Sequence, residues 1–251
     1  MSTLPRPLLF LHGFTGTPRC WRELLSRLPG VEAHVPTLRG HAGREERGPP
    51  VPFEHEVARL AESVRSEVSE RVHLVGYSLG ARLGLGLLLR RPDLVASATL
   101  VGLQPGLARR MDRDRRARQD DAWVRLLEER GMQAFVAAWE RQPLFASQAQ
   151  LAPEVRRAQR ADRLSHHPGG LAWALRSLGT ARMPSYWEEL PRVRIPVHLM
   201  AGQLDTKFKE LGFRAARALR CRMTVVAEAG HNLVLERPDA VASAILEGLG
   251  A

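Results

Sequence analysis

The sequence predicts an α/β fold: a mostly parallel sheet of about six strands with helices on both faces and an inserted helical cap. Three observations lead to this prediction. Short runs that are apolar at every position alternate with longer stretches of helical spacing, as in parallel sheets that are buried on both faces. One such run leads through Gly76-Tyr77-Ser78-Leu79-Gly80 into a helix. The middle of the chain, by contrast, has helical patterns and no convincing strand.

Each expected strand is a short apolar run bounded by turn residues. The first, Leu8-Leu9-Phe10-Leu11, is apolar throughout and is ended by His12-Gly13. Val72-His73-Leu74-Val75 precedes the glycine-flanked serine. In chain order, the expected strands are 8–11, 31–38, 72–75, 98–101, 197–201 and 223–227.

The expected helices have apolar residues three or four positions apart, which places those residues on one face. The clearest stripes are Trp21, Leu24, Leu25 and Leu28, and then Val57, Leu60, Ala61 and Val64. The core helices are expected over 21–28, 53–68, 81–89, 207–219 and 238–249, with a polar loop over 39–52. Those of the cap are expected over 112–129, 132–140, 153–164 and 171–178. We therefore expect a core made of 1–103 and 190–251, and a cap made of 104–189.

Length and composition fit one large α/β domain with an insertion. The chain has 251 residues, of which 44% are hydrophobic and 25% charged. No apolar run approaches the roughly 20 residues that span a bilayer, and Met1 to Pro7 is too short and proline-rich for a signal peptide. We therefore expect a cytoplasmic protein with no membrane partner. Cys20 and Cys221 match no metal spacing and are expected to be reduced thiols.

The formal charge of +10 raises the question of nucleic-acid binding. Only Lys207 and Lys209 among the 37 basic residues are lysines, and the arginines are scattered instead of forming one stripe. We therefore expect no nucleic-acid partner.

Ser78 has the context of a catalytic nucleophile. A strand, G-x-S-x-G and a helix make a nucleophile elbow, in which the serine projects from a tight turn at the end of the strand. Gly76 and Gly80 leave the room that such a turn needs. The alternative is a chance occurrence of a short pattern.

A serine hydroxyl needs an imidazole as base, and the imidazole needs a carboxylate to orient it. Asp205 follows a late strand and His231 follows the last one, so Ser78, Asp205 and His231 form a candidate triad in the order that this type of fold uses. The alternatives are a helix N-cap for Asp205, which is compatible with catalysis, and a surface-loop histidine for His231. His12 is expected to hold the turn after the first strand.

The oxyanion hole requires two backbone N–H groups. We expect them from Leu79, after the nucleophile, and from Phe14, in the turn after the first strand. The sequence contains no metal-ligand cluster and no glycine-rich phosphate loop. We therefore expect chemistry without a metal or cofactor.

These motifs resemble the α/β-hydrolase superfamily over the whole chain, through Leu11-His12-Gly13-Phe14-Thr15-Gly16, the elbow and Gly230-His231. Further stretches resemble the 2-succinyl-6-hydroxy-2,4-cyclohexadiene-1-carboxylate synthases, a lyase family of menaquinone biosynthesis. They are Gly80-Ala81-Arg82, Gln142-Pro143-Leu144-Phe145-Ala146-Ser147, Gly179-Thr180, Pro184-Ser185-Tyr186-Trp187 and Leu204-Asp205-Thr206-Lys207-Phe208. One departure is the short stretch before Leu8, which leaves no room for the N-terminal hairpin of many superfamily members.

The resemblance implies an elimination and not a hydrolysis. A base removes a ring proton next to the succinyl carbonyl, and pyruvate leaves from an enolpyruvyl ether. Ser78 would take the proton with support from His231, and the oxyanion hole would hold the enolate. The substrate of that family is a small tricarboxylate.

A tricarboxylate requires cations, and Arg82 lies one helical turn beyond Ser78 on an otherwise apolar helix. A charge there needs a partner, and the nearby helix N-terminus disfavours a cation. A bound anion removes both costs, whereas a structural salt bridge is the alternative.

The resemblance adds three substrate-binding candidates in the cap, and the position of Tyr77 adds a fourth. Arg116 matches an anion-binding arginine by its position relative to Trp123, and Trp139 and Arg160 match two further cap positions. Tyr77 is expected to line the pocket beside the nucleophile. For the cap residues the alternative is a surface or core role.

Two other functions remain open. A carboxylesterase or C–C bond hydrolase would use the same triad through an acyl-enzyme, but it would favour an apolar pocket over one with arginines. A noncatalytic ligand-binding protein of this fold would usually lack a triad residue. We expect a monomer or a weak homo-oligomer.

Overall fold

The computed structural model describes residues 6–43, 45–46 and 48–250. It contains one six-stranded sheet with the order β2-β1-β3-β4-β5-β6, in which all neighbouring strands are parallel. This confirms the predicted fold class and strand number. The strands are β1 (Leu8–Leu11), β2 (Ala33–His34), β3 (Val72–Tyr77), β4 (Val95–Val101), β5 (Val197–Gly202) and β6 (Arg222–Val226). Residues 1–5 lie outside the described residues, and they make up most of the segment in which no signal peptide is expected. Residues 44 and 47 of the expected polar loop also lie outside the described residues.

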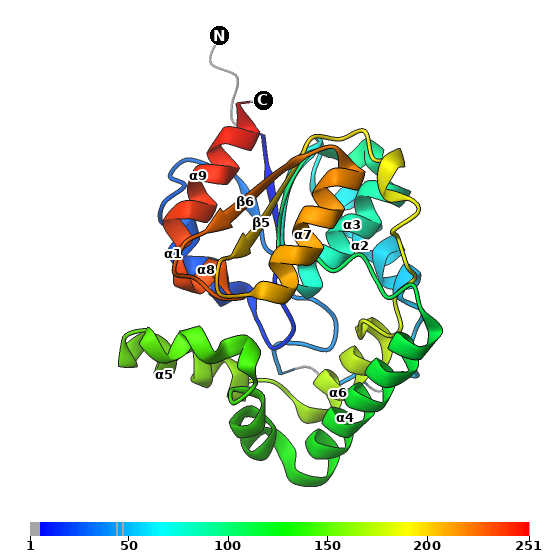
Figure 1. Ribbon diagram of the computed structural model, residues 1–251, viewed down its shortest axis with the longest axis vertical. Coiled ribbons are helices and arrows are strands. Elements are labelled where there is room, and N and C mark those ends of the chain that lie inside the picture. Colours follow the sequence, from blue (N-terminus) through cyan, green and yellow to red (C-terminus); the bar gives the residue numbers. More distant parts are fainter. Residues whose placement is uncertain (1–5, 44, 47, 251) are drawn as a thin grey trace.

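Helices cover both faces of the sheet (Figure 1). Those of the core are α1 (Arg22–Leu25), α2 (Phe53–Glu67), α3 (Leu79–Arg90), α7 (Thr206–Leu219), α8 (Leu233–Glu236) and α9 (Pro238–Leu249). Between β4 and β5 the chain forms α4 (Arg110–Trp139), a 3₁₀ helix η3 (Pro143–Gln150), α5 (Pro153–Leu164) and α6 (Pro168–Leu178). Shorter 3₁₀ segments are Pro18–Trp21, Pro92–Leu94 and Leu190–Arg192.

The two faces of β1 show why its residues are apolar at every position. Leu9 and Leu11 pack into a cluster with residues of α2, α3 and α7, whereas Leu8 and Phe10 pack into a second cluster with residues of α1, α8 and α9. All four side chains are at most 2% exposed. Burying both faces holds the ends of the central strands, and the loops that follow them, in fixed positions.

α4, η3, α5 and α6, here called the cap helices, lie together beyond one end of the sheet (Figure 1). They have an apolar cluster of their own, which includes Val124, Leu127, Phe135 and Leu171. Phe14 of the core packs against this cluster. The boundaries of the core and cap at 103/104 and 189/190 stay a prediction.

Several elements differ from their expected bounds. β2 is only two residues long where 31–38 was expected, and Pro36, which cannot donate to a sheet hydrogen bond, follows soon after it. α4 runs through the place where two helices were expected, but Gly131 breaks its backbone with φ 69° and ψ −173°. In the expected helix 21–28 only 22–25 is α-helical. Among the helices of the described residues, none is long and apolar enough to cross a membrane.

Candidate active site

The turn at Ser78 is strained, and its neighbours have no room for side chains. Ser78 has φ 51° and ψ −102°, a conformation that L-residues rarely adopt. A Cβ at Gly80 would lie 1.8 Å from the carbonyl oxygen of Leu11, and one at Gly76 would lie 2.7 Å from that of Gly80. Glycines are therefore required on both sides of the serine, as the elbow motif predicts.

The structure brings together the three residues of the candidate triad. His231 Nε2 lies 3.0 Å from Ser78 Oγ, and His231 Nδ1 lies 2.7 Å from Asp205 Oδ2. Asp205 Oδ1 also accepts a hydrogen bond of 3.2 Å from the backbone N–H of Phe208, so the same carboxylate caps α7. With Asp205 accepting at Nδ1, Nε2 is placed to accept the serine proton.

The loop that carries His231 is held by a carboxylate that the sequence interpretation did not single out. Glu236 is 7% exposed and accepts from the backbone N–H of Gly230 at 2.7 Å and of Asn232 at 3.3 Å. These two amides flank His231, so Glu236 fixes the backbone on both sides of the imidazole. In the sequence, the available signal for this role was that Glu236 lies four residues after Asn232, at the end of the short helix α8.

The two amides expected to form the oxyanion hole line the same cavity as Ser78. Phe14 and Leu79 are both among the lining residues. Within the described part of the chain, neither backbone N–H donates a hydrogen bond to another protein group. Their assignment to an oxyanion stays a prediction, which this availability supports.

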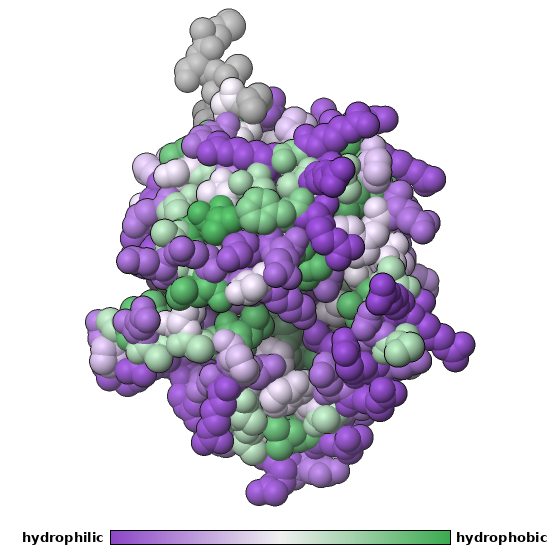
Figure 2. All heavy atoms as spheres, in the orientation of Figure 1, coloured by the Kyte–Doolittle hydropathy of each residue, from purple (hydrophilic) through white to green (hydrophobic). Residues whose placement is uncertain are grey.

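The cavity has a volume of about 700 Å³ and lies between the ends of the central strands and the cap helices. Figure 2 shows the hollow between the two halves, with hydrophobic residues inside and hydrophilic ones around it. From the core it is lined by Ser78, His231 and Arg82, from the cap helices by Arg116 and Trp139, and from the segment between β4 and α4 by Gln104. Such a cavity is large enough for a small organic substrate.

Arg82 lies in this cavity without a carboxylate partner among the described residues. Its Nη1 donates to the carbonyl oxygen of Leu178 at 2.6 Å, and its guanidinium carbon lies 5.9 Å from the centroid of the Phe53 ring. The side chain is 8% exposed. Burial, together with the charge of Arg116, lowers the pKa of Arg82 to about 9. This environment penalises the positive charge and favours a bound anion.

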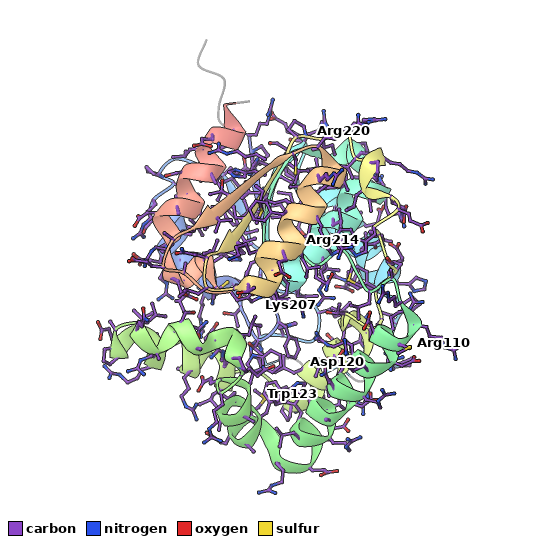
Figure 3. All side chains as sticks on the ribbon, viewed as in Figure 1. Arg110, Asp120, Trp123, Lys207, Arg214 and Arg220 are labelled. Carbon is purple, nitrogen blue, oxygen red and sulfur yellow. The ribbon has the colours of Figure 1, made fainter. Side chains whose placement is uncertain are left out.

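Arg116 reaches the cavity from α4, and it is partly neutralised. Its Nε donates to Asp120 Oδ1 at 2.8 Å. The other carboxylate oxygen of Asp120 is buried and has no hydrogen-bond partner among the described residues. Burial raises the pKa of Asp120. Asp120 and Trp123 lie close together along α4 (Figure 3), and the Trp123 ring packs within the cap against Phe135 and Trp139.

The aromatic candidates line the cavity as the sequence interpretation proposed. Trp139 packs edge-on against Phe14, with ring centroids 5.2 Å apart, and its indole N–H is buried without an acceptor in the described part of the chain. The Tyr77 ring lies 5.4 Å from that of His231. Burial raises the pKa of Tyr77, so its phenol stays protonated.

Arg160 is the site candidate that the structure does not bring to this cavity. Its guanidinium pairs with Glu140 and lines a second hollow between α5 and η3. Arg163, one turn further along α5, lines the same second hollow but is only 4% exposed. It pairs with Glu140 at 3.1 Å, lies 4.9 Å from the centroid of the Phe145 ring, and its charge acts on Tyr77. The sequence does not show which of two arginines on one helix turns inward.

Lys207 and Gln104 also line the cavity, although neither was a site candidate. Gln104 is 6% exposed, and its amide oxygen is buried without a partner among the described groups. Lys207 stands in the first turn of α7. The sequence contained a signal for Lys207, since it is a cation near a helix N-terminus. The same reasoning had singled out Arg82.

His12 has the structural role that was expected of it. It is fully buried, its Nδ1 lies 2.9 Å from the carbonyl oxygen of Gly13, and its Nε2 accepts from the backbone N–H of Leu38 at 3.1 Å. Burial lowers its pKa to about 4, so the ring is neutral at pH 7. It therefore ties the turn that carries Phe14 to the segment after β2.

Among the described residues, no three His, Cys, Asp or Glu side chains are placed to hold a metal ion. Chemistry without a metal or cofactor stays a prediction.

The fold and the Ser–His–Asp geometry define an enzyme of the α/β-hydrolase class. Residues 8–244 match the profile of the alpha/beta hydrolase family. A Bacillus subtilis protein, provisionally named as a 2-succinyl-6-hydroxy-2,4-cyclohexadiene-1-carboxylate synthase, is 33% identical over 91% of this chain and 84% of its own length. A synthase of that name from Enterobacter is 30% identical over 96% of this chain and 90% of its own.

The structural comparison points the same way. MenH from S. aureus has a TM-score of 0.93 and 27% identity, and the match covers 98% of this chain and 93% of that one. The chain belongs to the alpha/beta hydrolase family and, within it, to the 2-succinyl-6-hydroxy-2,4-cyclohexadiene-1-carboxylate synthases.

Proposed function

We propose that this protein is a cofactor-free carbon–oxygen lyase of menaquinone biosynthesis. It eliminates pyruvate from 2-succinyl-5-enolpyruvyl-6-hydroxy-3-cyclohexene-1-carboxylate and forms 2-succinyl-6-hydroxy-2,4-cyclohexadiene-1-carboxylate. The observation that carries the proposal is the cavity itself, in which a Ser–His–Asp arrangement lies beside a buried arginine without a carboxylate partner among the described residues. Family membership supports the same activity.

The reaction begins with proton abstraction. Ser78 Oγ, made basic by its hydrogen bond to His231 Nε2, removes the ring proton next to the succinyl carbonyl. The electron pair of the broken C–H bond moves onto the carbonyl oxygen and forms an enolate. The proton passes through the serine to His231, whose imidazolium form Asp205 stabilises.

The enolate is the species that the site must stabilise most. The amides of Phe14 and Leu79 are available to donate to its oxygen. When the enolate collapses, a new double bond completes the ring diene, and the bond between the ring and the enolpyruvyl oxygen breaks. The enolpyruvate that leaves takes up a proton and becomes pyruvate, so neither a redox partner nor an acyl-enzyme is needed.

The cations around the triad suit a substrate with three carboxylates. Arg82 approaches from α3 and Arg116 from α4, so the core and the cap helices each contribute charge. Tyr77 and Trp139 supply apolar walls for the ring. We propose that 104–189 acts as the cap that completes this pocket. A cytoplasmic location and a monomeric or weakly associated state remain predictions.

The decisive experiment is a coupled assay that measures pyruvate release from the enolpyruvyl substrate by the purified protein. We expect turnover in buffer without added cofactor. Absence of pyruvate release from correctly folded protein would refute the proposal.

A carboxylesterase activity is the alternative that the triad geometry alone also supports, because a serine activated in this way can attack an ester. Short p-nitrophenyl esters test it. If ester turnover exceeded pyruvate release in kcat/KM, the protein would be an esterase and the arginines would need another role.

A further inference from the structure

Lys207 occupies the mouth of the cavity. It lies two residues after Asp205, in the first turn of α7, at the end of that helix nearest the cap helices (Figure 3). Leu204 and Phe208, its neighbours along the chain, line the cavity with it. A ligand in the cavity can therefore contact this side chain.

The surroundings of Lys207 disfavour its positive charge. Although the residue is exposed, partial desolvation lowers its pKa, and the charges of Arg116 and Arg115 on α4 lower it further. Lys207 also stands at a helix N-terminus, where the helix dipole repels a cation.

Little in the protein compensates for these effects. Asp205 attracts Lys207, but its two oxygens already accept from His231 and from the N–H of Phe208. Across the described residues, Lys207 forms no ion pair of its own. Its ammonium lies 5.3 Å from the centroid of the Phe208 ring, which is a weak substitute for an anion. A bound carboxylate would offset all of these costs together.

We propose that Lys207 binds a carboxylate of the substrate at the mouth of the cavity, as a third cation in addition to Arg82 and Arg116. The three side chains come from three different helices, α7, α3 and α4, and all of them line the cavity. A substrate with three carboxylates can pair with all three cations at once. This inference rests on the proposed function, because it takes the substrate to be a tricarboxylate.

The chain offers a direct chemical test, because Lys207 and Lys209 are its only lysines. Lys209 lies on the same helix, is not among the cavity-lining residues, and donates to the carbonyl oxygen of Gln203 at 3.4 Å. The two lysines are acetylated with acetic anhydride in the Ser78→Ala variant, with and without intact substrate, and the modified peptides are quantified by mass spectrometry. We expect saturating substrate to slow acetylation of Lys207 by about 10-fold and that of Lys209 by less than about 2-fold.

Matched substitutions provide the second measurement. Lys207→Met should lower kcat/KM for pyruvate release by about 5- to 30-fold, mainly through KM; the effect is moderate because Lys207 is exposed and solvent screens its pairing. Lys207→Arg should retain most of the activity, and Lys209→Met should stay within about 2-fold of the wild type. The decline of kcat/KM with added salt should be shallower in Lys207→Met.

A thermal-shift measurement with Ser78→Ala separates the two ways in which this test can fail. If substrate raises the melting temperature but leaves both lysines equally reactive, the role of Lys207 is refuted and the proposed function stands. Equal effects of Lys207→Met and Lys209→Met on KM would refute it too. If substrate does not bind at all, the proposed function fails, and the inference about Lys207 fails with it.

Discussion

The guanidinium of Arg82 donates to the carbonyl oxygen of Leu178, 2.6 Å away, and so joins α3 of the core to the last residue of cap helix α6. This contact uses one of its five N–H donors. Arg82 also lines the cavity, and no carboxylate among the described residues pairs with its guanidinium. Arg82 is therefore both a link between the two layers and a cation that a substrate carboxylate can bind.

Replacing Arg82 by alanine tests the second role. A charge-assisted, partly desolvated pair contributes roughly 2–4 kcal/mol, so kcat/KM for pyruvate release should fall by about 30- to 1000-fold. Arg82→Lys should retain only part of the wild-type kcat/KM, because lysine lacks the bidentate fork of arginine. Arg90→Ala on the same helix is the control, since Arg90 pairs at the surface with Glu54 and Glu189. If Arg82 had only the structural role, Arg82→Ala would impair turnover of a neutral ester as much as pyruvate release.

The triad makes the most direct prediction. Ser78→Ala, Asp205→Asn and His231→Ala should each lower kcat by on the order of 100-fold or more, while circular dichroism and the melting temperature remain close to the wild type. The reason is that proton abstraction needs the serine, its base and the carboxylate that orients the base. Near-normal pyruvate release by Ser78→Ala would rule out the serine as the base.

Arg160 and Arg163 form a matched pair on α5. Arg163 is buried against Phe145, whose ring borders the cavity, whereas the Arg160 side chain is 40% exposed. Arg163→Ala should raise KM by about 10-fold and lower the melting temperature by about 3–8 °C, from the loss of packing and of the pair with Glu140. For Arg160→Ala we expect little change in either quantity. KM is measured by steady-state kinetics and the melting temperature by differential scanning fluorimetry. If Arg160→Ala raised KM more than Arg163→Ala does, Arg160 would again be the candidate for substrate contact.

Acid should destabilise the folded protein through buried neutral histidines. Burial lowers the pKa of His12 and of His73 to about 4, from 6.5 in the unfolded chain. As the pH falls below 6.5, the unfolded chain binds these protons first, so stability is lost progressively between pH 6.5 and 4. Each histidine should reduce the free energy of unfolding by about 2 kcal/mol between pH 7 and 5.

His73 allows this effect to be isolated, because it is remote from the cavity lining and its ring nitrogens lie 2.7 Å from Ser97 Oγ and 3.0 Å from Thr99 Oγ1. In urea denaturation, His73→Gln should weaken the pH dependence by about 2 kcal/mol over that interval. An unchanged slope would show that His73 is not responsible.

Activity should survive treatment with a strong chelator. The proposed elimination uses only protein groups, and no metal-ligand cluster occurs among the described residues. Pyruvate release is measured before and after dialysis against EDTA. Loss of activity that a divalent ion restores would reveal a site that the present interpretation lacks.

The sequence itself determined the sheet, the elbow and the order of the triad. Fully apolar runs such as Leu8–Leu11 have one stable place, inside a sheet covered on both faces, and G-x-S-x-G between a strand and a helix permits one type of turn. Residues that follow parallel strands of one sheet lie along the same edge, so Ser78, Asp205 and His231 could be placed together from their positions after strands. These are local or topological constraints, and sequence patterns express them directly.

Only the tertiary structure decided which side chains of the cap are buried and which stay at the surface. Arg160 and Arg163 lie on the same helix, and the rotation of α5 against η3 buries Arg163 while Arg160 stays at the surface. The structure also brings Lys207 of α7 close enough to Arg116 of α4 for their charges to interact. In the same way, Glu236 accepts a hydrogen bond across a turn from the loop that carries His231. The physical reason is that helix rotation and inter-layer contacts depend on how whole surfaces pack, which the pattern of any one segment does not contain.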